Sequence, residues 1–196
     1  MRSLVYYVAT SVDGFIADRE GGVGAFPVDR GTLAALFDRY PETCPAHLRD
    51  ALGVNGEAQR FDTVIMGART HEPALEAGLT SAYPHLRQYI ATHRELPPDP
   101  TVTTVAGDVG AVVRDLRSLP GRDIWLCGGA DLAGQLIDEI DEIQLKVNPV
   151  VLGDGVPLFA GRGRPHGLTH HSAEVLPGGV VLTTYRRPRP ATPADA

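Results

Sequence analysis

The chain has 196 residues, 43% of them hydrophobic, so it is long and apolar enough to fold as one globular domain with its own core. A formal net charge of −6 argues against a general nucleic-acid-binding surface. The two cysteines are too few for a disulfide framework, and neither they nor the histidines have the spacing of metal ligands. The N-terminal apolar run is too short for a signal peptide or a membrane span, so we expect a cytoplasmic protein.

Strand-like and helical segments alternate along most of the chain. β-Branched and aromatic runs predict the strands, and apolar residues at helical spacing predict the helices. The expected strands cover residues 3–10, 61–67, 86–94, 101–107, 122–129 and 141–153, the last interrupted at Asn148-Pro149. The expected helices cover residues 29–40, 45–54, 68–79, 109–121 and 130–140, with Pro41, Gly53 and Asp108 as end signals.

The C-terminal part of the chain has the pattern of a hairpin. Residues 166–187 predict two strands joined by a turn at Pro177-Gly178-Gly179, and residues 188–196 predict a disordered tail. The alternation before the hairpin predicts one α/β domain over residues 1–187, with a mostly parallel central sheet and helices on both faces. The hairpin then adds an antiparallel edge to this sheet.

Two glycines, Gly128 and Gly129, stand where a predicted strand ends and a helix begins. A helix N-terminus exposes unpaired N–H groups with partial positive charge, and glycine lets phosphate oxygens approach such a backbone closely. The alternative is a tight strand-to-helix turn that only requires small residues. The G-x-G-x-x-G fingerprint is absent, so a standard Rossmann site is not indicated.

A second strand-to-helix junction contains Gly67, Arg69 and Thr70. Thr70 is a candidate helix cap and Arg69 a candidate partner for phosphate, although this junction alone also fits a structural role. Two phosphate-competent junctions in one sheet suit a dinucleotide better than either junction does alone.

The loop over residues 11–17 contains Asp13-Gly14, a common turn sequence. One interpretation is that Asp13 shapes the turn by accepting a hydrogen bond from the backbone. The other is that the loop is a flexible flap over a substrate and that Asp13 relays a proton.

These three elements, in this order, resemble the dihydrofolate-reductase-like superfamily. The similarity is greatest to the reductase domain of bifunctional riboflavin-biosynthesis enzymes and to its stand-alone relatives. Residues 11–17 (SVDGFIA) match the family pattern S-L-D-G-x-I-A with Val12 in place of the leucine. Residues 67–72 (GARTHE) match G-R-x-T-[YW]-E except that Ala68 replaces the arginine and His71 replaces the aromatic residue. Residues 128–159 match G-G-x-x-L-x-x-x-L, then D-E, then PVLLGxGxPLF.

The resemblance implies NADPH bound across the sheet edge. It would set the backbone of Gly128, Gly129 and Ala130 against the pyrophosphate. Gly67, Arg69 and Thr70 would lie on the other side, near the pyrophosphate or the 2′-phosphate. It would turn Thr92, His93 and Arg94 toward the adenosine 2′-phosphate and place Ala9 and Ile16 beside the nicotinamide. Because Ala68 replaces the family arginine, either Arg69 or Arg94 would supply the charge on the phosphate side, and the preference for NADPH over NADH stays open.

The resulting hypothesis is an NADPH-dependent oxidoreductase that transfers a hydride to a C=O or C=N bond of a small substrate, heterocyclic or similar to a pterin or a ribityl compound. Asp13, or a water that it orients, would supply the proton. A dihydrofolate reductase proper is one alternative, and a non-catalytic NADPH-binding module is another. Folate would need a carboxylate near the first helix; Asp38, Glu42 and Asp50 are candidates, but each is expected to be surface charge.

We also expect a homodimer and no nucleic-acid or membrane partner. The closing segments 143–153 and 180–187 are apolar, and as a sheet edge they would be exposed in a monomer.

Overall fold

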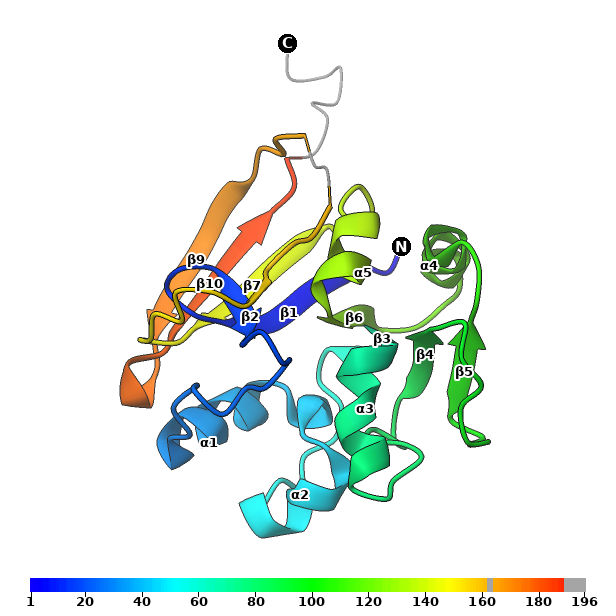
Figure 1. Ribbon diagram of the computed structural model, residues 1–196, viewed down its shortest axis with the longest axis horizontal. Coiled ribbons are helices and arrows are strands. Elements are labelled where there is room, and N and C mark those ends of the chain that lie inside the picture. Colours follow the sequence, from blue (N-terminus) through cyan, green and yellow to red (C-terminus); the bar gives the residue numbers. More distant parts are fainter. Residues whose placement is uncertain (162–163, 189–196) are drawn as a thin grey trace.

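A computed structural model describes residues 1–161 and 164–188, which build an eight-stranded sheet with helices packed against it (Figure 1). In spatial order the strands are β5 (Val102–Val105), β4 (Arg87–Ala91), β3 (Phe61–Gly67), β6 (Asp123–Gly128), β1 (Leu4–Thr10), β7 (Glu142–Val147), β10 (Val181–Arg186) and β9 (Thr169–Val175). The helices are α1 (Arg30–Arg39), α2 (Ala46–Leu52), α3 (Ala68–Glu76), α4 (Val109–Ser118) and α5 (Ala130–Gln135), with short 3₁₀ turns at Pro41–Thr43 and Pro177–Gly179.

The sheet is parallel from β5 through β7 and antiparallel at its other end. β1 pairs with β6 and β7 in parallel, and β3 and β4 continue the parallel part. β10 then pairs antiparallel with β7 and with β9. The mostly parallel α/β sheet and the closing hairpin are therefore confirmed.

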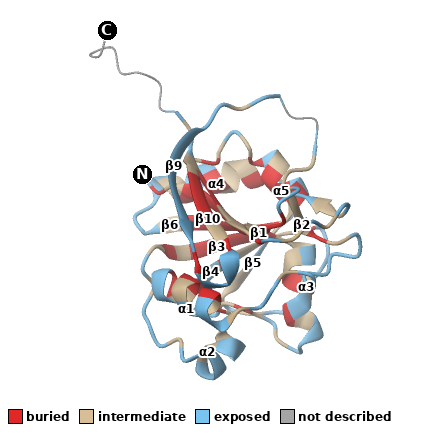
Figure 2. Cartoon of the chain, turned by 90° about the vertical axis from the view of Figure 1, so that its left-hand side faces the viewer, coloured by how far each residue is buried: buried red, intermediate tan, exposed pale blue. Residues whose placement is uncertain are grey.

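Alternating residues of β1 supply two separate cores, one on each face of the sheet. Leu4, Tyr6 and Val8 pack with α4 and α5, whereas Val5 and Tyr7 pack with Leu36 of α1. A strand buried on both faces is apolar along its whole length, as residues 4–9 are. The buried strands run through the middle of the molecule in Figure 2, and the expectation of helices on both faces is confirmed.

Local signals set three of the helix ends. Asp29 and Asp108 each accept a backbone N–H three residues on, from Thr32 at 2.7 Å and from Ala111 at 3.0 Å. Such caps satisfy donors that the first helical turn leaves free. Gly53 closes α2 in the left-handed conformation (φ 66°) that glycine adopts without steric penalty. Thr70 does not cap α3: Gly67 takes that position without a side-chain bond, and Thr70 lies in the first turn.

The expected strand over residues 141–153 is wrong in its second half. β7 ends at Val147, where the amide of Asn148 bonds the backbone oxygens of Thr10 (3.3 Å) and Lys146 (3.0 Å). Pro149 has no N–H for a ladder, and Val150 closes a tight turn onto the Asn148 carbonyl. The chain then returns as β8 (Val156–Pro157), which pairs with β2 (Phe15–Ala17) in a second, two-stranded sheet.

Several other elements are shorter than expected, and two of them matter for the site. β4 ends at Ala91, so Thr92, His93 and Arg94 follow the strand, and α5 ends at Gln135 rather than near residue 140. Of the expected disordered tail over 188–196, all but Pro188 lies outside the described residues. In the described part of the chain, every helix is too short or too polar to cross a bilayer.

Candidate active site

A cleft of about 1110 Å³ lies at the carboxyl ends of β3, β6, β1 and β7. Parallel sheets commonly bind ligands at this edge, because loops and helix N-termini meet there. The loop from β2 to α1, the α1 helix and the start of α3 complete its walls. Its charged lining residues, among those described, are Arg19, Glu20, Arg69, Glu72, Arg94, Asp131 and Lys146.

The structure brings the two glycine-bearing junctions together in this cleft. A Cβ atom on Gly128 would lie 3.8 Å from Thr70 Oγ1, one on Gly129 would lie 3.7 Å from it, and one on Gly67 would lie 3.8 Å from Gly129 N. Gly128 has φ 135°, which favours glycine, and the peptide bond to Gly129 is cis. Bare glycine backbone from two neighbouring strand ends therefore forms one continuous cradle, which the Thr70 hydroxyl borders.

Two arginines line the same cleft as this cradle. Arg69 is in the first turn of α3 and lines the cleft. Arg94 lines it as well, with its Nη1 atom 2.7 Å from Glu72 Oε1 and its backbone N–H donating to Thr92 Oγ1 at 3.0 Å. The Arg94 side chain is 71% exposed and that of Glu72 is 41% exposed, so the pair is solvent-screened and a phosphate can displace the carboxylate without a large penalty.

Most of the residues predicted for the site meet in the cleft. Its lining includes Ala9, Ile16, Gly67, Arg69, Thr70, Arg94, Gly128, Gly129 and Ala130. Thr92, His93 and Asp13 are outside the lining. Thr92 is buried and positions the backbone of Arg94, while His93 is exposed.

The Asp13 carboxylate is held by backbone hydrogen bonds. Its carboxylate accepts N–H bonds from Leu152 at 3.1 Å and Gly153 at 2.7 Å, and so ties the 11–14 loop to the turn after β7. A hydrogen bond from Ser11 and these backbone bonds lower the pKa of Asp13 to about 2. A carboxylate this acidic is ionised at neutral pH and has no proton to donate. Its hydrogen bonds therefore favour the interpretation that Asp13 shapes the loop. Its backbone partners are 139 and 140 positions away, not two residues on as expected.

The candidates for a folate-binding carboxylate are also outside the cleft. The expectation of surface charge is wrong for Glu42, which is buried and accepts the backbone N–H groups of Gln59, Arg60 and Phe61 at 3.0, 2.8 and 2.7 Å. It thereby fixes the entry into β3. Asp38 and Asp50 do not line the cleft either. Among the described residues no group of three or more acidic, His or Cys side chains could hold a metal ion.

The wall between the cradle and α1 holds residues that the sequence patterns did not single out. Tyr7, Trp125 and Cys127 line it from β1 and β6, and Leu36 and Phe37 line it from α1. Lys146 adds an ammonium group from β7, 4.0 Å from the centroid of the Tyr7 ring. One sequence signal was available: Lys146 is the single lysine of the chain, beside 17 arginines.

The family model of the RibD C-terminal domain matches residues 2–182 of this chain. The chain belongs to this family. A Bacillus subtilis relative, the uncharacterized protein YwjB, is 31% identical over 185 residues, which is 90% of each chain. A second protein of that organism, YyaP, is 25% identical over 94% of each chain.

Solved structures share the fold of this RibD C-terminal domain. A Shewanella protein named for riboflavin biosynthesis has a TM-score of 0.68 at 24% identity, over 95% of this chain and 99% of that one. A Thermotoga maritima deaminase/reductase has a TM-score of 0.63 at 14% identity, and the match covers 95% of this chain and 56% of that one. A pyrimidine reductase-like protein from Corynebacterium diphtheriae has a TM-score of 0.60 at 14% identity, and the match covers 96% of this chain and 93% of that one. The fold is that of reductase-like proteins.

Proposed function

We propose that this RibD C-terminal domain is an NADPH-dependent reductase that adds a hydride to a C=O or C=N bond of a small heterocyclic substrate. The observation that carries the proposal is the side-chain-free cradle of Gly67, Gly128 and Gly129. A pyrophosphate can reach this backbone because no Cβ atom occupies the space above it. When bound, the cofactor supplies the hydride, and the protein supplies binding, orientation and the exclusion of water.

The chain's residues divide the cleft into two halves. Arg69 and Arg94 place positive charge beside the cradle, where the phosphates of the cofactor would lie. The half toward α1 is largely apolar and aromatic, with Tyr7, Leu36 and Trp125 in its wall. Such a wall suits a planar ring and keeps water away from the reacting atoms.

The size of the cleft favours catalysis over cofactor sensing alone. Ligand pockets commonly measure about 300–1000 Å³, so a cleft above that range has room for a cofactor and a second molecule. The Thermotoga relative is named as a reductase of 5-amino-6-(5-phosphoribosylamino)uracil, which supports a nitrogen heterocycle as the substrate class. We also propose a cytoplasmic location, which is what the short N-terminal apolar run led us to expect. Nothing in the described cleft favours folate, because α1 presents no carboxylate to it.

The single tryptophan gives a direct test. Trp125 lines the cleft, so NADPH binding should quench its emission and transfer energy to the reduced nicotinamide. Gly129→Asp places a negative charge in the cradle where a new Cβ would meet only ordinary contacts, so the fold should survive and NADPH binding should be lost. Gly167→Asp is the matched control, because Gly167 is exposed, has open space around it and lies outside the cleft.

The proposal is contradicted if Gly129→Asp binds NADPH as tightly as the unmutated protein. It is also contradicted if the unmutated protein binds NADPH but oxidises none of it with a panel of cyclic imines, diketones and reduced pterins, a result that would leave a binding module.

A further inference from the structure

Lys146 is the one lysine among 196 residues, and it lies in the cleft. All the other 17 basic residues are arginines. An arginine keeps its proton at any physiological pH, whereas a lysine in an enclosed site can release one. A site that needs a cation only for binding has no reason to use the less common side chain of this chain, so the lysine points to a role in which its proton is released.

The strand register places Lys146 next to the expected nicotinamide position. Lys146 is opposite Ala9 of β1 in the parallel ladder, and Ala9 also lines the cleft. β6, which ends in the glycine cradle, is two strands from β7 in the order β6-β1-β7. Two inter-strand spacings are about 10 Å, a separation that one nucleoside can bridge. A dinucleotide with its pyrophosphate on the cradle therefore reaches Lys146 with its nicotinamide end.

The ammonium group has no fixed carboxylate partner among the described residues. Its one recorded polar contact is with the face of the Tyr7 ring, 4.0 Å from the centroid. This contact holds the side chain in place but leaves its N–H groups free for a ligand. The Tyr7 hydroxyl is buried, has no hydrogen-bond partner in the described structure and does not compete for that ligand.

We propose that Lys146 is the proton donor to the acceptor atom of the substrate, an inference that rests on the proposed reductase function. As the acceptor carbon gains the hydride, its C=O or C=N π pair moves to the oxygen or nitrogen. That heteroatom forms a new bond to a proton, the N–H bond of the Lys146 ammonium breaks, and Lys146 becomes a neutral amine. A proton from water restores the ammonium. The substrate class is a planar ring that carries its C=O or C=N bond at the Lys146 end of the cleft.

The titration of neighbouring groups agrees with this role. Burial lowers the pKa of Lys146 to about 8, close to the value that favours proton donation near neutral pH. From β6, the Cys127 thiol faces it, but burial raises the pKa of that thiol to about 12; from β1, burial raises the pKa of Tyr7 well above its ordinary value. The loop before α1 brings Arg19, which is paired with Asp154, and Glu20 to the cleft. The residues that line it from α1 and from the segment before β10 are uncharged: Thr32, Leu33, Leu36, Phe37 and Val180.

A first experiment needs no substrate. Protein grown with [ε-¹³C]lysine gives one resonance, from Lys146, in an otherwise unmodified chain. NADP⁺ and 2′-phospho-ADP-ribose, which lacks the nicotinamide, are added in turn, and calorimetry measures their binding. We expect both to bind, but only NADP⁺ to move the resonance and lower its titration midpoint, because the positive ring disfavours a nearby ammonium. If both bind and Lys146 responds to neither or equally to both, this inference is overturned and the proposed function stands. If neither binds, both are overturned.

A second experiment separates proton donation from charge. With the imine or diketone that the unmutated protein reduces fastest, Lys146→Met should lower kcat by about 10²–10⁴-fold with little change in the Kd for NADPH. Lys146→Arg keeps the charge but not the proton release, so it should stay impaired. In the unmutated protein kcat should fall as pH rises through about 8, because the acid must be protonated, and both variants should lose this limb. Full recovery by Lys146→Arg would overturn proton donation and leave Lys146 as a binding cation.

Discussion

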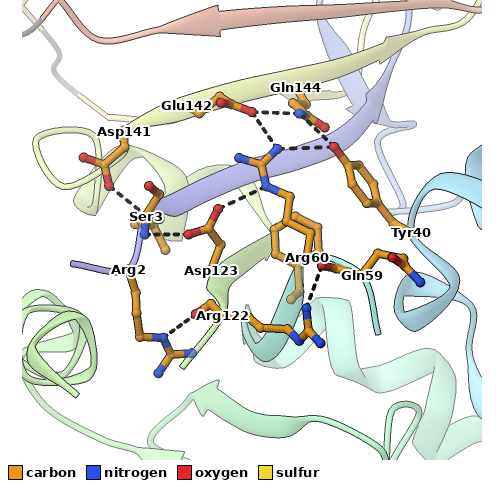
Figure 3. A network of polar contacts seen from close by, with 12 residues as sticks. Arg2, Ser3, Tyr40, Gln59, Arg60, Arg122, Asp123, Asp141, Glu142 and Gln144 are labelled. Carbon is orange, nitrogen blue, oxygen red and sulfur yellow. Dashed lines mark hydrogen bonds and ion pairs between the residues drawn. The ribbon is translucent and has the colours of Figure 1, made fainter. Parts of the chain in front are cut away.

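Arg60 donates a hydrogen bond to Glu142 at the N-terminal end of the parallel strands, with Arg60 Nη1 2.8 Å from Glu142 Oε1 (Figure 3). The same guanidinium bonds Asp123 at the start of β6 at 3.1 Å and the Tyr40 hydroxyl at 3.2 Å. Arg186 of β10 donates to the other oxygen of Glu142 at 2.9 Å. The entry into β3 and the N-terminal ends of β6 and β7 are thus joined around the buried carboxylate of Glu142, at the opposite end of the sheet from the cleft.

Glu142→Gln should lower the free energy of unfolding by roughly 1–3 kcal/mol, because the buried Glu142 is the shared partner of Arg60 and Arg186, whose side chains are 22% and 51% exposed. Glu174→Gln is the control: Glu174 pairs with Arg39 on the surface, where a pair contributes about 1 kcal/mol or less. Urea unfolding of both variants measures the difference. Similar losses in the two proteins would mean that the Arg60 network contributes no more than a surface pair.

Acid should weaken the same network. Burial alone would raise the pKa of Glu142, but the bonds from Arg60 and Arg186 outweigh it and hold the pKa below its usual 4.5. A lowered pKa in the folded state stabilises the protein above pH 4.5, and that stabilisation is lost as pH falls through the folded value. Between pH 7 and pH 3 the free energy of unfolding should therefore fall more steeply with decreasing pH in the unmutated protein than in Glu142→Gln.

Asp13→Asn should leave turnover and NADPH affinity near normal. Its carboxylate points to the backbone of Leu152 and Gly153, and an amide oxygen can still accept one of these bonds. In the unmutated protein the Gly153 amide resonance should titrate with a midpoint near 2, the pKa of Asp13. A fall in single-turnover hydride transfer of about 10²–10⁴-fold in Asp13→Asn would instead restore the proton relay.

The sequence could predict what local patterns determine. Gly128-Gly129 and the 67–70 junction are short motifs, and the strand-helix alternation around them predicts the parallel sheet in which they meet. The partners of Asp13 are 139 and 140 positions away, so no local pattern predicts them. Glu42 likewise has the local pattern of a surface residue, because its burial depends on the backbone of residues 59–61, which packs against it in the fold. The place of Lys146 in the cleft could not be predicted from its neighbours in sequence, because it depends on the pairing of β7 with β1.

The homodimer stays a prediction, but the apolar edge expected from residues 143–153 and 180–187 is wrong. β7 and β10 are inside the sheet, and the edge strand at this end is β9, whose residues are all exposed (Figure 2). An open edge strand offers unpaired backbone groups to a second copy. We expect sedimentation at twice the chain mass of 20.9 kDa. Val175→Lys on β9 should weaken the dimer, and Val151→Lys, at a similarly exposed valine in a loop, should not.

Arg94 should set the preference for NADPH over NADH. It stands at the cleft beside the cradle, and its current partner is the exposed carboxylate of Glu72. A charge-assisted bond to a 2′-phosphate contributes about 1.5–3 kcal/mol, so Arg94→Ala should weaken NADPH binding by roughly 10- to 100-fold. NADH lacks that phosphate and should bind as before. Quenching of Trp125 measures both affinities.

Glu72→Gln sharpens this test because it acts in the opposite direction. Removing the carboxylate frees Arg94 from its competing partner and removes a negative charge from the cleft, so NADPH should bind more tightly while NADH changes less. Arg114→Ala is the control for lost surface charge, since Arg114 pairs with Glu139 away from the cleft. If Arg94→Ala weakens both cofactors equally, Arg94 contacts the pyrophosphate, and Arg69 becomes the candidate for the 2′-phosphate. If the unmutated protein binds NADH as tightly as NADPH, neither arginine recognises that group.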